Sequence, residues 1–224
     1  MKIEVMQFEQ MEYVVRYPNG YMEGTKGPLI IFLHGAGSRG KNMQKLLNNP
    51  FFRITNQLTD FPFVTVAPQC SENTWFDMFS ELQGLVRKVA NEIYVDTKQI
   101  YLIGASMGGY AVWQLAMSMP EYFAAICPIC GGGMYWNAGR LVNVPVWAFH
   151  GKLDETVLVE ESEKMVKAIN RRGGNARLTV YQNCGHDAWS DAYRSSEVYE
   201  WLLSHRNNKD ITETDEYNRS DLYG

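Results

Sequence analysis

The 224-residue sequence predicts an α/β fold, in which a mostly parallel central sheet lies between layers of helices on both faces. Several short apolar runs lack the alternation of a half-exposed strand, so they fit strands that are covered on both faces. Segments with apolar residues at spacings of three and four lie between these runs, as in amphipathic helices. Strands that alternate with helices along one chain imply βαβ crossovers and therefore parallel pairing.

The strand candidates follow one another along the chain. Residues 6–17 mix apolar and charged side chains and lead into a Pro-Asn-Gly turn, which is typical of an edge strand or a hairpin. The apolar runs are Leu29–Leu33, Phe63–Ala67, Ile100–Ile103 and Val144–Phe149, with a weaker run at Phe123–Cys127. Ala176–Tyr181 alternates between apolar and polar residues, so we expect this strand near an edge of the sheet.

Helical stripes fill the intervals between these strands. The stripes run from Phe79 to Ile93, Ala111 to Met119, Leu158 to Ile169 and Ala188 to Leu203. Proline ends the second stripe and a pair of glycines ends the third. We expect residues 1–204 to form a single domain and residues 205–224, which are polar, to form a C-terminal surface tail.

Composition and charge exclude several classes of function. The formal net charge is −4, which argues against a partner with a phosphate backbone and hence against nucleic acid. No apolar window is long enough to span a membrane, and the first ten residues contain Glu4 and Glu9 where a signal peptide is apolar. We therefore expect a cytoplasmic protein with reduced cysteines. The sequence does not predict the oligomeric state.

The strongest motif is Gly104-Ala-Ser-Met-Gly108, which follows a predicted strand and opens a predicted helix. A nucleophile elbow needs this context, because a tight turn must lift the hydroxyl of Ser106 clear of the backbone. A Cβ at either glycine would collide with the neighbouring strand or helix. The first N–H groups of the helix favour negative charge at the same place. We predict Ser106 as the nucleophile; the alternative is a solvent-facing serine in a glycine-rich turn.

A serine nucleophile needs a base, and the chain has four histidines. His34 and His150 directly follow predicted strands, and His205 lies in the polar C-terminal end. His186 lies in the loop after Ala176–Tyr181, where an α/β sheet places its functional site. We therefore predict His186 as the base, with an ordinary surface-loop histidine as the alternative.

The base needs a carboxylate that fixes its tautomer and stabilises the imidazolium. Asp154 lies just past the end of another predicted strand, and the order Ser106, Asp154, His186 is the α/β-hydrolase order of nucleophile, acid and base. The other acids considered are Glu155, Asp187 and Asp191. Glu155 is expected to face away from Asp154. Asp187 and Asp191 are expected to cap the last helix or to lie on its surface. Asp154 is the predicted acid.

Two backbone donors should stabilise the oxyanion of a tetrahedral intermediate. One is the N–H group of Met107, the residue after the predicted nucleophile. The other should come from the small-residue loop His34–Ser38, with the N–H of Ala36 as the first choice and that of Gly37 as the second. The alternative is that this loop is only a tight turn into a helix.

These motifs resemble α/β-hydrolases of the phospholipase/carboxylesterase group, which includes acyl-protein thioesterase-like and feruloyl-esterase-like enzymes. The matching segments are LIIFLHGAGSRG, APQCSENTWFD, YLIGASMGGY, VWAFHGKLDETV and NCGHDAW. The resemblance implies a serine hydrolase that cleaves carboxylic esters or thioesters, with no metal or organic cofactor. It also implies that Trp75 lies beside the acyl pocket. Trp189, three residues after the base, is a second candidate for the substrate pocket, and core packing is the alternative for both.

Many relatives carry a long lid insertion between the strand near Cys127–Cys130 and Val144, and this chain has only residues 131–139 there. We therefore expect no large lid and an open, shallow site for small or extended acyl groups. Met134, Tyr135 and Trp136 could form a small apolar wall.

The remaining cysteine and histidine motifs suggest no metal. Cys127-Pro-Ile-Cys130 has the spacing of a metal or redox motif, but a metal would want a second pair, and none is present. His34 is expected to shape its loop rather than bind a metal. Cys70 and Cys184 flank the site loops without an assigned role.

Several alternatives to a carboxylesterase stay open. The same three residues could serve a thioesterase, a peptidase, a dienelactone-type hydrolase or an acyltransferase, and the fold could serve a non-catalytic binding protein. Dienelactone hydrolases usually have a cysteine as nucleophile, and Ser106 counts against that class. A peptidase usually brings a further domain. The expected partner is a small-molecule ester.

Overall fold

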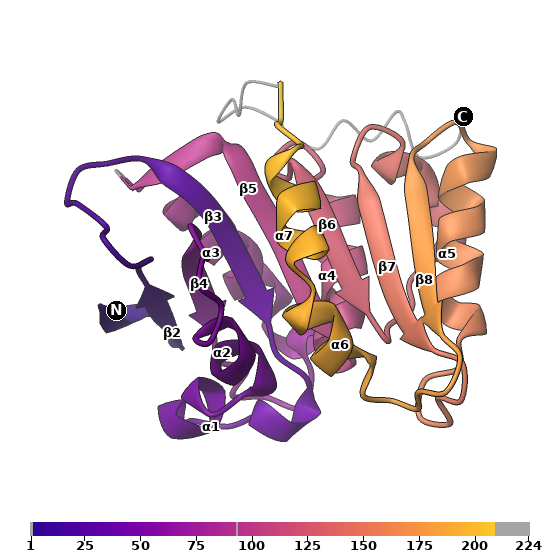
Figure 1. Cartoon of the computed structure of the whole chain (residues 1–224), viewed down its shortest axis with the longest axis horizontal. Coiled ribbons are helices and arrows are strands. Elements are labelled where there is room, and N and C mark those ends of the chain that lie inside the picture. The colour runs from indigo at the N-terminus through magenta and orange to yellow at the C-terminus, as the bar shows by residue number, and fades with distance from the viewer. Residues whose placement is uncertain (1, 93, 209–224) are drawn as a thin grey trace.

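The computed structural model describes residues 2–92 and 94–208, and an eight-stranded sheet forms its centre (Figure 1). Ile93 of the first predicted helix stripe and residues 209–224 of the predicted tail lie outside the described residues. The strands are β1 Ile3–Phe8, β2 Met11–Arg16, β3 Gly27–Leu33, β4 Val64–Pro68, β5 Val95–Ala105, β6 Ala125–Ile129, β7 Val146–Gly151 and β8 Ala176–Tyr181. Their order across the sheet is β1-β2-β4-β3-β5-β6-β7-β8.

Strand pairing confirms the mostly parallel sheet. β1 and β2 form an antiparallel hairpin, β2 runs antiparallel to β4, and all pairs from β4 to β8 are parallel. β8 is an edge strand, as its alternating sequence predicts. The hairpin turns at Glu9, which has a positive φ of 53°, and both strands precede the Pro-Asn-Gly segment that marked the expected turn.

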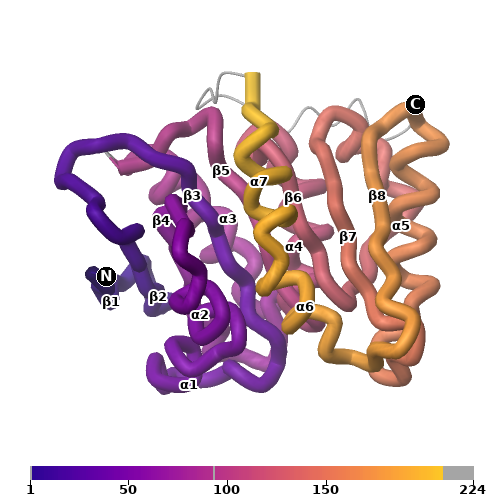
Figure 2. The backbone as a smooth tube through the Cα atoms, in the orientation of Figure 1, coloured from indigo at the N-terminus to yellow at the C-terminus, as the bar shows by residue number. Residues whose placement is uncertain are grey.

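Helices cover both faces of the sheet, and Figure 2 shows the same arrangement as a tube. They are α1 Met43–Leu47, α2 Pro50–Thr55, α3 Phe79–Ala90, α4 Met107–Ser118, α5 Glu160–Arg171, α6 Ala188–Arg194 and α7 Ser196–Leu203. Three short 3₁₀ turns are η1 Ala36–Ser38, η2 Trp75–Met78 and η3 Tyr135–Leu141. No helix in the described ranges is both long and apolar enough to cross a membrane.

Two hydrophobic cores lie on opposite faces of the sheet. Leu29 and Ile31 of β3 pack into the core under α3, α4 and α5, whereas Ile30 and Phe32 pack into the core under α2, α6 and α7. Successive residues of a strand point to opposite faces, so a strand covered on both sides reads as a continuous apolar run. This explains why the runs in the sequence predict the central strands.

Two parts of the helical layer differ from the prediction. The last predicted helix is two helices, α6 and α7, because Ser195 adopts an extended conformation with φ −75° and ψ 114°. α1 and α2 have no predicted counterpart. Asn42 caps α1, and Asn49 caps α2 with Pro50 at its first position, so the start signals are present in the sequence.

The first residues of the predicted tail are attached to β5. The N–H of Asn207 donates to the carbonyl of Lys98 over 2.8 Å, and Arg206 forms an ion pair with Asp96 over 2.7 Å. Tyr101 donates its hydroxyl hydrogen to the carbonyl of His205 over 2.8 Å. Within the described residues, the chain is therefore held to the sheet as far as Asn207.

A buried arginine joins the hairpin to α2. The Arg16 side chain extends from β2 and is 1% exposed. It donates to Thr55 Oγ1 over 2.7 Å and to Asn56 Oδ1 over 2.8 Å, at the end of α2. Its other neighbours are Thr65 Oγ1 and the rings of Phe51, Phe52 and Phe61. Burial lowers the pKa of Arg16 to about 10, so the side chain stays charged at neutral pH and bonds to neutral oxygens and rings.

Candidate active site

Ser106, His186 and Asp154 lie in one hydrogen-bonded line at the carboxyl edge of the sheet. Ser106 Oγ is 2.8 Å from His186 Nε2, and His186 Nδ1 is 2.7 Å from Asp154 Oδ2. The three residues follow β5, β8 and β7. Because the carboxyl ends of parallel strands meet at one edge, loops distant in sequence converge there.

The backbone presents Ser106 on a strained turn. The residue has φ 57° and ψ −121°, outside the regions that side chains favour, and its N–H donates to the carbonyl of Ile129 over 2.9 Å. A Cβ at Gly108 would lie 1.9 Å from the carbonyl oxygen of Leu33, and one at Gly104 would lie 2.6 Å from that of Gly108. Only glycine fits at these two positions, which lets β5, α4 and β3 approach closely enough to expose the serine.

The partners of His186 fix its tautomer. Asp154 can only accept when ionised, so Nδ1 carries the hydrogen and Nε2 is free to accept one from Ser106. The Asp154 side chain is fully buried, and burial by itself would raise its pKa. Hydrogen bonds from His186 and from the N–H groups of Val157 and Thr156 outweigh burial, so the pKa of Asp154 is lower than usual. The carboxylate is therefore ionised at neutral pH.

The other acids have separate roles. Asp187 caps α6, since its Oδ1 accepts from the N–H of Ser190 over 3.2 Å, as the sequence suggested. Asp191 pairs with Arg194 over 3.5 Å on the surface, and Glu155 is exposed.

Two free backbone N–H groups lie at helix starts beside Ser106. Ala36 opens η1 and Met107 opens α4. Among the hydrogen bonds of residues 2–92 and 94–208, neither amide donates to an acceptor. First-turn N–H groups have no partner within their helix, so both can bind an anion. This is where the sequence places the two oxyanion donors.

His34 shapes the loop that carries Ala36. Its Nε2 accepts from the N–H of Cys70 over 3.0 Å, so Nδ1 carries the hydrogen and donates to the carbonyl of Gly35 over 2.7 Å. Burial lowers the pKa of His34 to about 4, which keeps the ring neutral and suited to this pair of bonds. Both ring nitrogens are occupied by backbone groups.

The placement of Trp75 in the substrate pocket is wrong. Its side chain is fully buried, and its Nε1–H donates to the carbonyl of His34 over 3.0 Å. The indole stacks at a tilt, 4.9 Å from the His34 ring, and does not line the cleft beside Ser106. Trp75 therefore supports the loop that carries His34 and Ala36 from within the core.

A cleft of about 780 Å³ opens in front of Ser106. Its apolar lining comes from Phe32, Pro50, Ala105, Trp189 and Tyr193, and its polar rim from Asn42, Gln44, Lys45, Asn48 and Asn49. Trp189 therefore lies where it was expected, with its ring perpendicular to that of His186 at 5.1 Å between centroids. The segment that contains α1 and α2, which has no predicted counterpart, supplies most of the rim.

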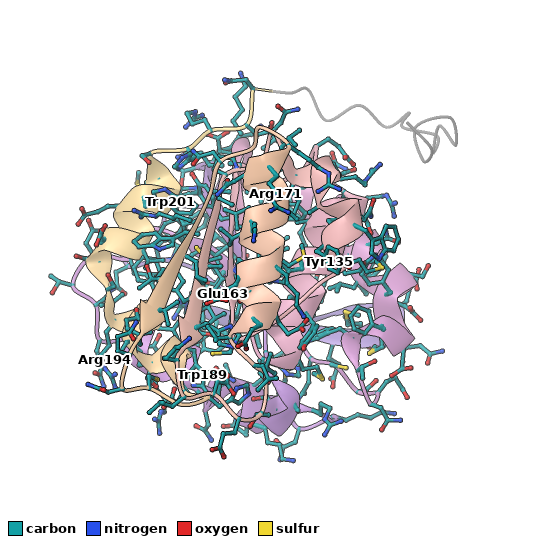
Figure 3. All side chains as sticks on the ribbon, turned by 90° about the vertical axis from the view of Figure 1, so that its right-hand side faces the viewer. Tyr135, Glu163, Arg171, Trp189, Arg194 and Trp201 are labelled. Carbon is teal, nitrogen blue, oxygen red and sulfur yellow. The ribbon has the colours of Figure 1, made fainter. Side chains whose placement is uncertain are left out.

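The proposed apolar wall at residues 134–136 is also wrong. Met134 lines a second hollow of about 520 Å³ together with Phe76, Phe79 and Tyr110. The side chains of Tyr135 and Trp136 are 54% and 63% exposed. Figure 3 shows Tyr135 and Trp189 on opposite sides of α5. The short segment after β6 turns toward the helices that cover the other face of the sheet.

One group of side chains has donor atoms close enough to suit a metal. Within the described ranges, ligand atoms of Cys130, His150 and Asp154 lie within 4.8 Å of one another, and all three residues are buried. Hydrogen bonds within the protein already occupy the imidazole and the carboxylate. Cys127 lies in the core, where burial raises the pKa of its thiol, so the two cysteines of the Cys-Pro-Ile-Cys segment do not share a site. We assign no metal to this group.

Comparison with known families agrees with this fold. The family model of dienelactone hydrolases matches residues 48–212, which include Ser106, Asp154 and His186. The chain belongs to the dienelactone hydrolase family. Ser106 lies inside the matched segment, so this member of the family has a serine at the predicted nucleophile position.

Curated relatives of this dienelactone hydrolase family member include fungal feruloyl esterases. Feruloyl esterase D of Neurospora crassa is 24% identical over 175 residues, which cover 72% of this chain and 59% of that protein. Feruloyl esterase C of Emericella nidulans is 23% identical over 212 residues, which cover 84% of this chain and 77% of that protein. The chain thus spans less than two thirds of the length of the first of these relatives.

Solved structures show the same fold. A thermostable esterase is 29% identical with a TM-score of 0.77, and the match covers 91% of this chain and 63% of that one. Est1E from Butyrivibrio proteoclasticus, solved with ferulic acid bound, is 16% identical with a TM-score of 0.70, and the match covers 90% and 98%. The predicted α/β-hydrolase fold and the resemblance to feruloyl-esterase-like enzymes are confirmed.

Proposed function

We propose that the protein is a serine hydrolase that cleaves carboxylic esters through an acyl-enzyme intermediate. The observation that carries the proposal is the line from Ser106 Oγ through His186 to Asp154, with bonds of 2.8 and 2.7 Å, at the mouth of a cleft. A serine with an adjacent base, and a base oriented by a third group, is the arrangement that activates a hydroxyl. Membership of a hydrolase family supports the same activity.

In the proposed reaction, Ser106 Oγ attacks the ester carbonyl carbon while His186 Nε2 takes the hydroxyl proton. The carbonyl oxygen gains the negative charge and accepts hydrogen bonds from the N–H groups of Ala36 and Met107. The carbon–oxygen bond to the alcohol then breaks, and His186 gives its proton to the leaving oxygen. Water next attacks the acyl group with His186 as base, which releases the acid and restores the hydroxyl of Ser106. Asp154 stays ionised throughout and stabilises the imidazolium.

The cleft supports a substrate with an apolar acyl group and a polar remainder. Phe32, Trp189 and Tyr193 line its apolar part, while amide side chains and Lys45 form the rim. About 780 Å³ falls within the range of pockets that bury a small organic molecule. Because relatives are named feruloyl esterases, we propose feruloyl esters as one candidate substrate class. We also propose a cytoplasmic location, supported by four cysteines that are all free thiols.

A panel of esters tests the proposed activity and the size of the acyl group. We expect the wild-type protein to hydrolyse p-nitrophenyl esters of two to four carbons and methyl ferulate, with kcat/KM falling for longer chains. A preference for acyl chains above ten carbons would contradict the proposed pocket. Absence of hydrolysis across the panel would contradict the proposed function. Product analysis with added alcohol separates hydrolysis from acyl transfer.

The substitution Ala36→Pro tests the proposed oxyanion donor. Gly35 before it is extended, with φ −76° and ψ 175°, which suits a residue that precedes proline, and Ala36 is the first residue of η1. The variant should therefore fold, yet lack one N–H donor. We expect kcat to fall by about 10²- to 10³-fold with little change in the thermal unfolding midpoint. Wild-type kcat in a folded variant would remove Ala36 from the proposed oxyanion site, and Ala36→Gly, which keeps the N–H, is the control.

A further inference from the structure

A second imidazole contacts the carboxylate of Asp154. His150, the penultimate residue of β7, is fully buried, and its Nε2 lies 3.3 Å from Asp154 Oδ2 and 2.8 Å from the carbonyl oxygen of Val157. Its Nδ1 lies 2.8 Å from Ser162 Oγ on α5. The reaction steps described above do not use this ring.

The neighbours of Nε2 require a hydrogen on this nitrogen. Both groups beside Nε2 are acceptors, a carboxylate oxygen and a carbonyl oxygen, so Nε2 must carry a hydrogen. The Nε2–H group of His150 donates to the carbonyl of Val157 over 2.8 Å, and Asp154 Oδ2, which accepts from His186, lies 3.3 Å from the same nitrogen. Asp154 Oδ1 accepts from the N–H groups of Thr156 and Val157, both over 2.9 Å.

We propose that His150 is a positioning residue, which acts through Asp154 by holding Oδ2 opposite His186. The inference rests on the proposed function. The N–H groups of Thr156 and Val157 bind Oδ1, so the position of Oδ2 depends on His186 and on contacts such as the one with His150. His150 restrains that position in two ways: its Nε2–H holds the carbonyl of Val157, a residue whose own N–H binds Oδ1, and Nε2 lies 3.3 Å from Oδ2. The carboxylate is thereby held where it meets the catalytic imidazole at 2.7 Å.

Contacts at Nδ1 anchor His150 to two further elements. Ser162 Oγ lies 3.1 Å from the carbonyl oxygen of Gly131, so it links the ring to α5 and to the segment after β6. Cys130 has a positive φ of 46° and brings its thiol within 4.8 Å of both His150 and Asp154. Burial raises the pKa of Cys130 to about 12, so this neighbour is a neutral thiol. The orientation of Asp154 is thus tied to three elements beyond its own loop.

A matched pair of variants tests this role. Glutamine can place its side-chain nitrogen where Nε2 lies and keep a donor beside Val157 and Asp154, whereas asparagine can reach only the position of Nδ1 beside Ser162. We expect His150→Asn to lower kcat for p-nitrophenyl acetate at least tenfold with KM changed less than twofold. We expect His150→Gln to stay within about threefold of the wild-type kcat. This ranking is expected if kcat depends on the N–H donor at the position of Nε2, beside Val157 and Asp154, and not on the contact with Ser162.

The opposite ranking, or wild-type kcat in His150→Asn, would overturn the proposal. NMR of the wild-type protein with ¹⁵N-labelled histidine provides a test that needs no variant. We expect a hydrogen on Nε2 of His150 and a strongly downfield Nδ1–H of His186, and an unprotonated Nε2 of His150 overturns the inference. If the wild-type protein hydrolyses no ester, the proposed function fails, and the NMR result still decides whether Nε2 of His150 carries the hydrogen that the inference requires.

Discussion

Replacing Ser106 with alanine should lower the turnover of p-nitrophenyl acetate by about four to six orders of magnitude, because the attacking oxygen is lost. The variant should also fail to react with a fluorophosphonate probe. In the wild-type protein, mass spectrometry should locate that probe on Ser106. Residual turnover reflects binding and oxyanion stabilisation, which alanine leaves in place.

The loss should not come from unfolding. The hydroxyl of Ser106 contacts His186, while the backbone N–H keeps its bond to Ile129 in the variant. Ser80→Ala, at an exposed position of α3, is the matched control and should retain wild-type turnover. Circular dichroism should show the same fold for both variants. Turnover near the wild-type rate in Ser106→Ala would exclude the proposed nucleophile.

Replacing Asp154 with asparagine should lower kcat at neutral pH by about 10⁴-fold. The N–H groups of Thr156 and Val157 face Oδ1, so they select the amide oxygen of the asparagine for that position. Its NH₂ group then faces His186, whose Nδ1 must become an acceptor. The hydrogen of the ring moves to Nε2 and points at Ser106, where it blocks acceptance of the hydroxyl proton.

Kinetics as a function of pH check this prediction. Asparagine cannot stabilise the imidazolium, so the variant should not recover wild-type kcat at any pH between 6 and 9. Asp191→Asn, which alters a surface ion pair with Arg194, is the control and should keep wild-type kcat. A fall of less than tenfold in Asp154→Asn would show that another carboxylate serves His186.

The central strands and the positions of the site loops could be predicted because burial on both faces leaves a strong pattern. Leu29–Leu33 and Ile100–Ile103 are continuous apolar runs for this reason, and the glycines around Ser106 mark the sharp turn that follows β5. α1 and α2 span five and six residues, too few for a helical period to show. The rim of the cleft was therefore missed, although Asn49 and Pro50 together signal a helix start.

Side-chain roles were harder to predict than positions. Sequence alone does not tell an aromatic residue that lines a cleft from one that supports a loop from behind, so Trp75 and Trp189 looked alike and proved different. His150 was set aside because it ends a strand, yet its place four residues before Asp154 brings the two side chains together. Only the course of the turn after β7 reveals that contact.

The contacts of Arg16 connect the sheet's outer hairpin to a helix that borders the cleft. The guanidinium of Arg16 donates hydrogen bonds at the end of α2. Pro50, the first residue of that helix, lines the cleft. The hairpin precedes the segment that the family model matches. A substitution of Arg16 would therefore reach the border of the cleft without altering Ser106, Asp154 or His186.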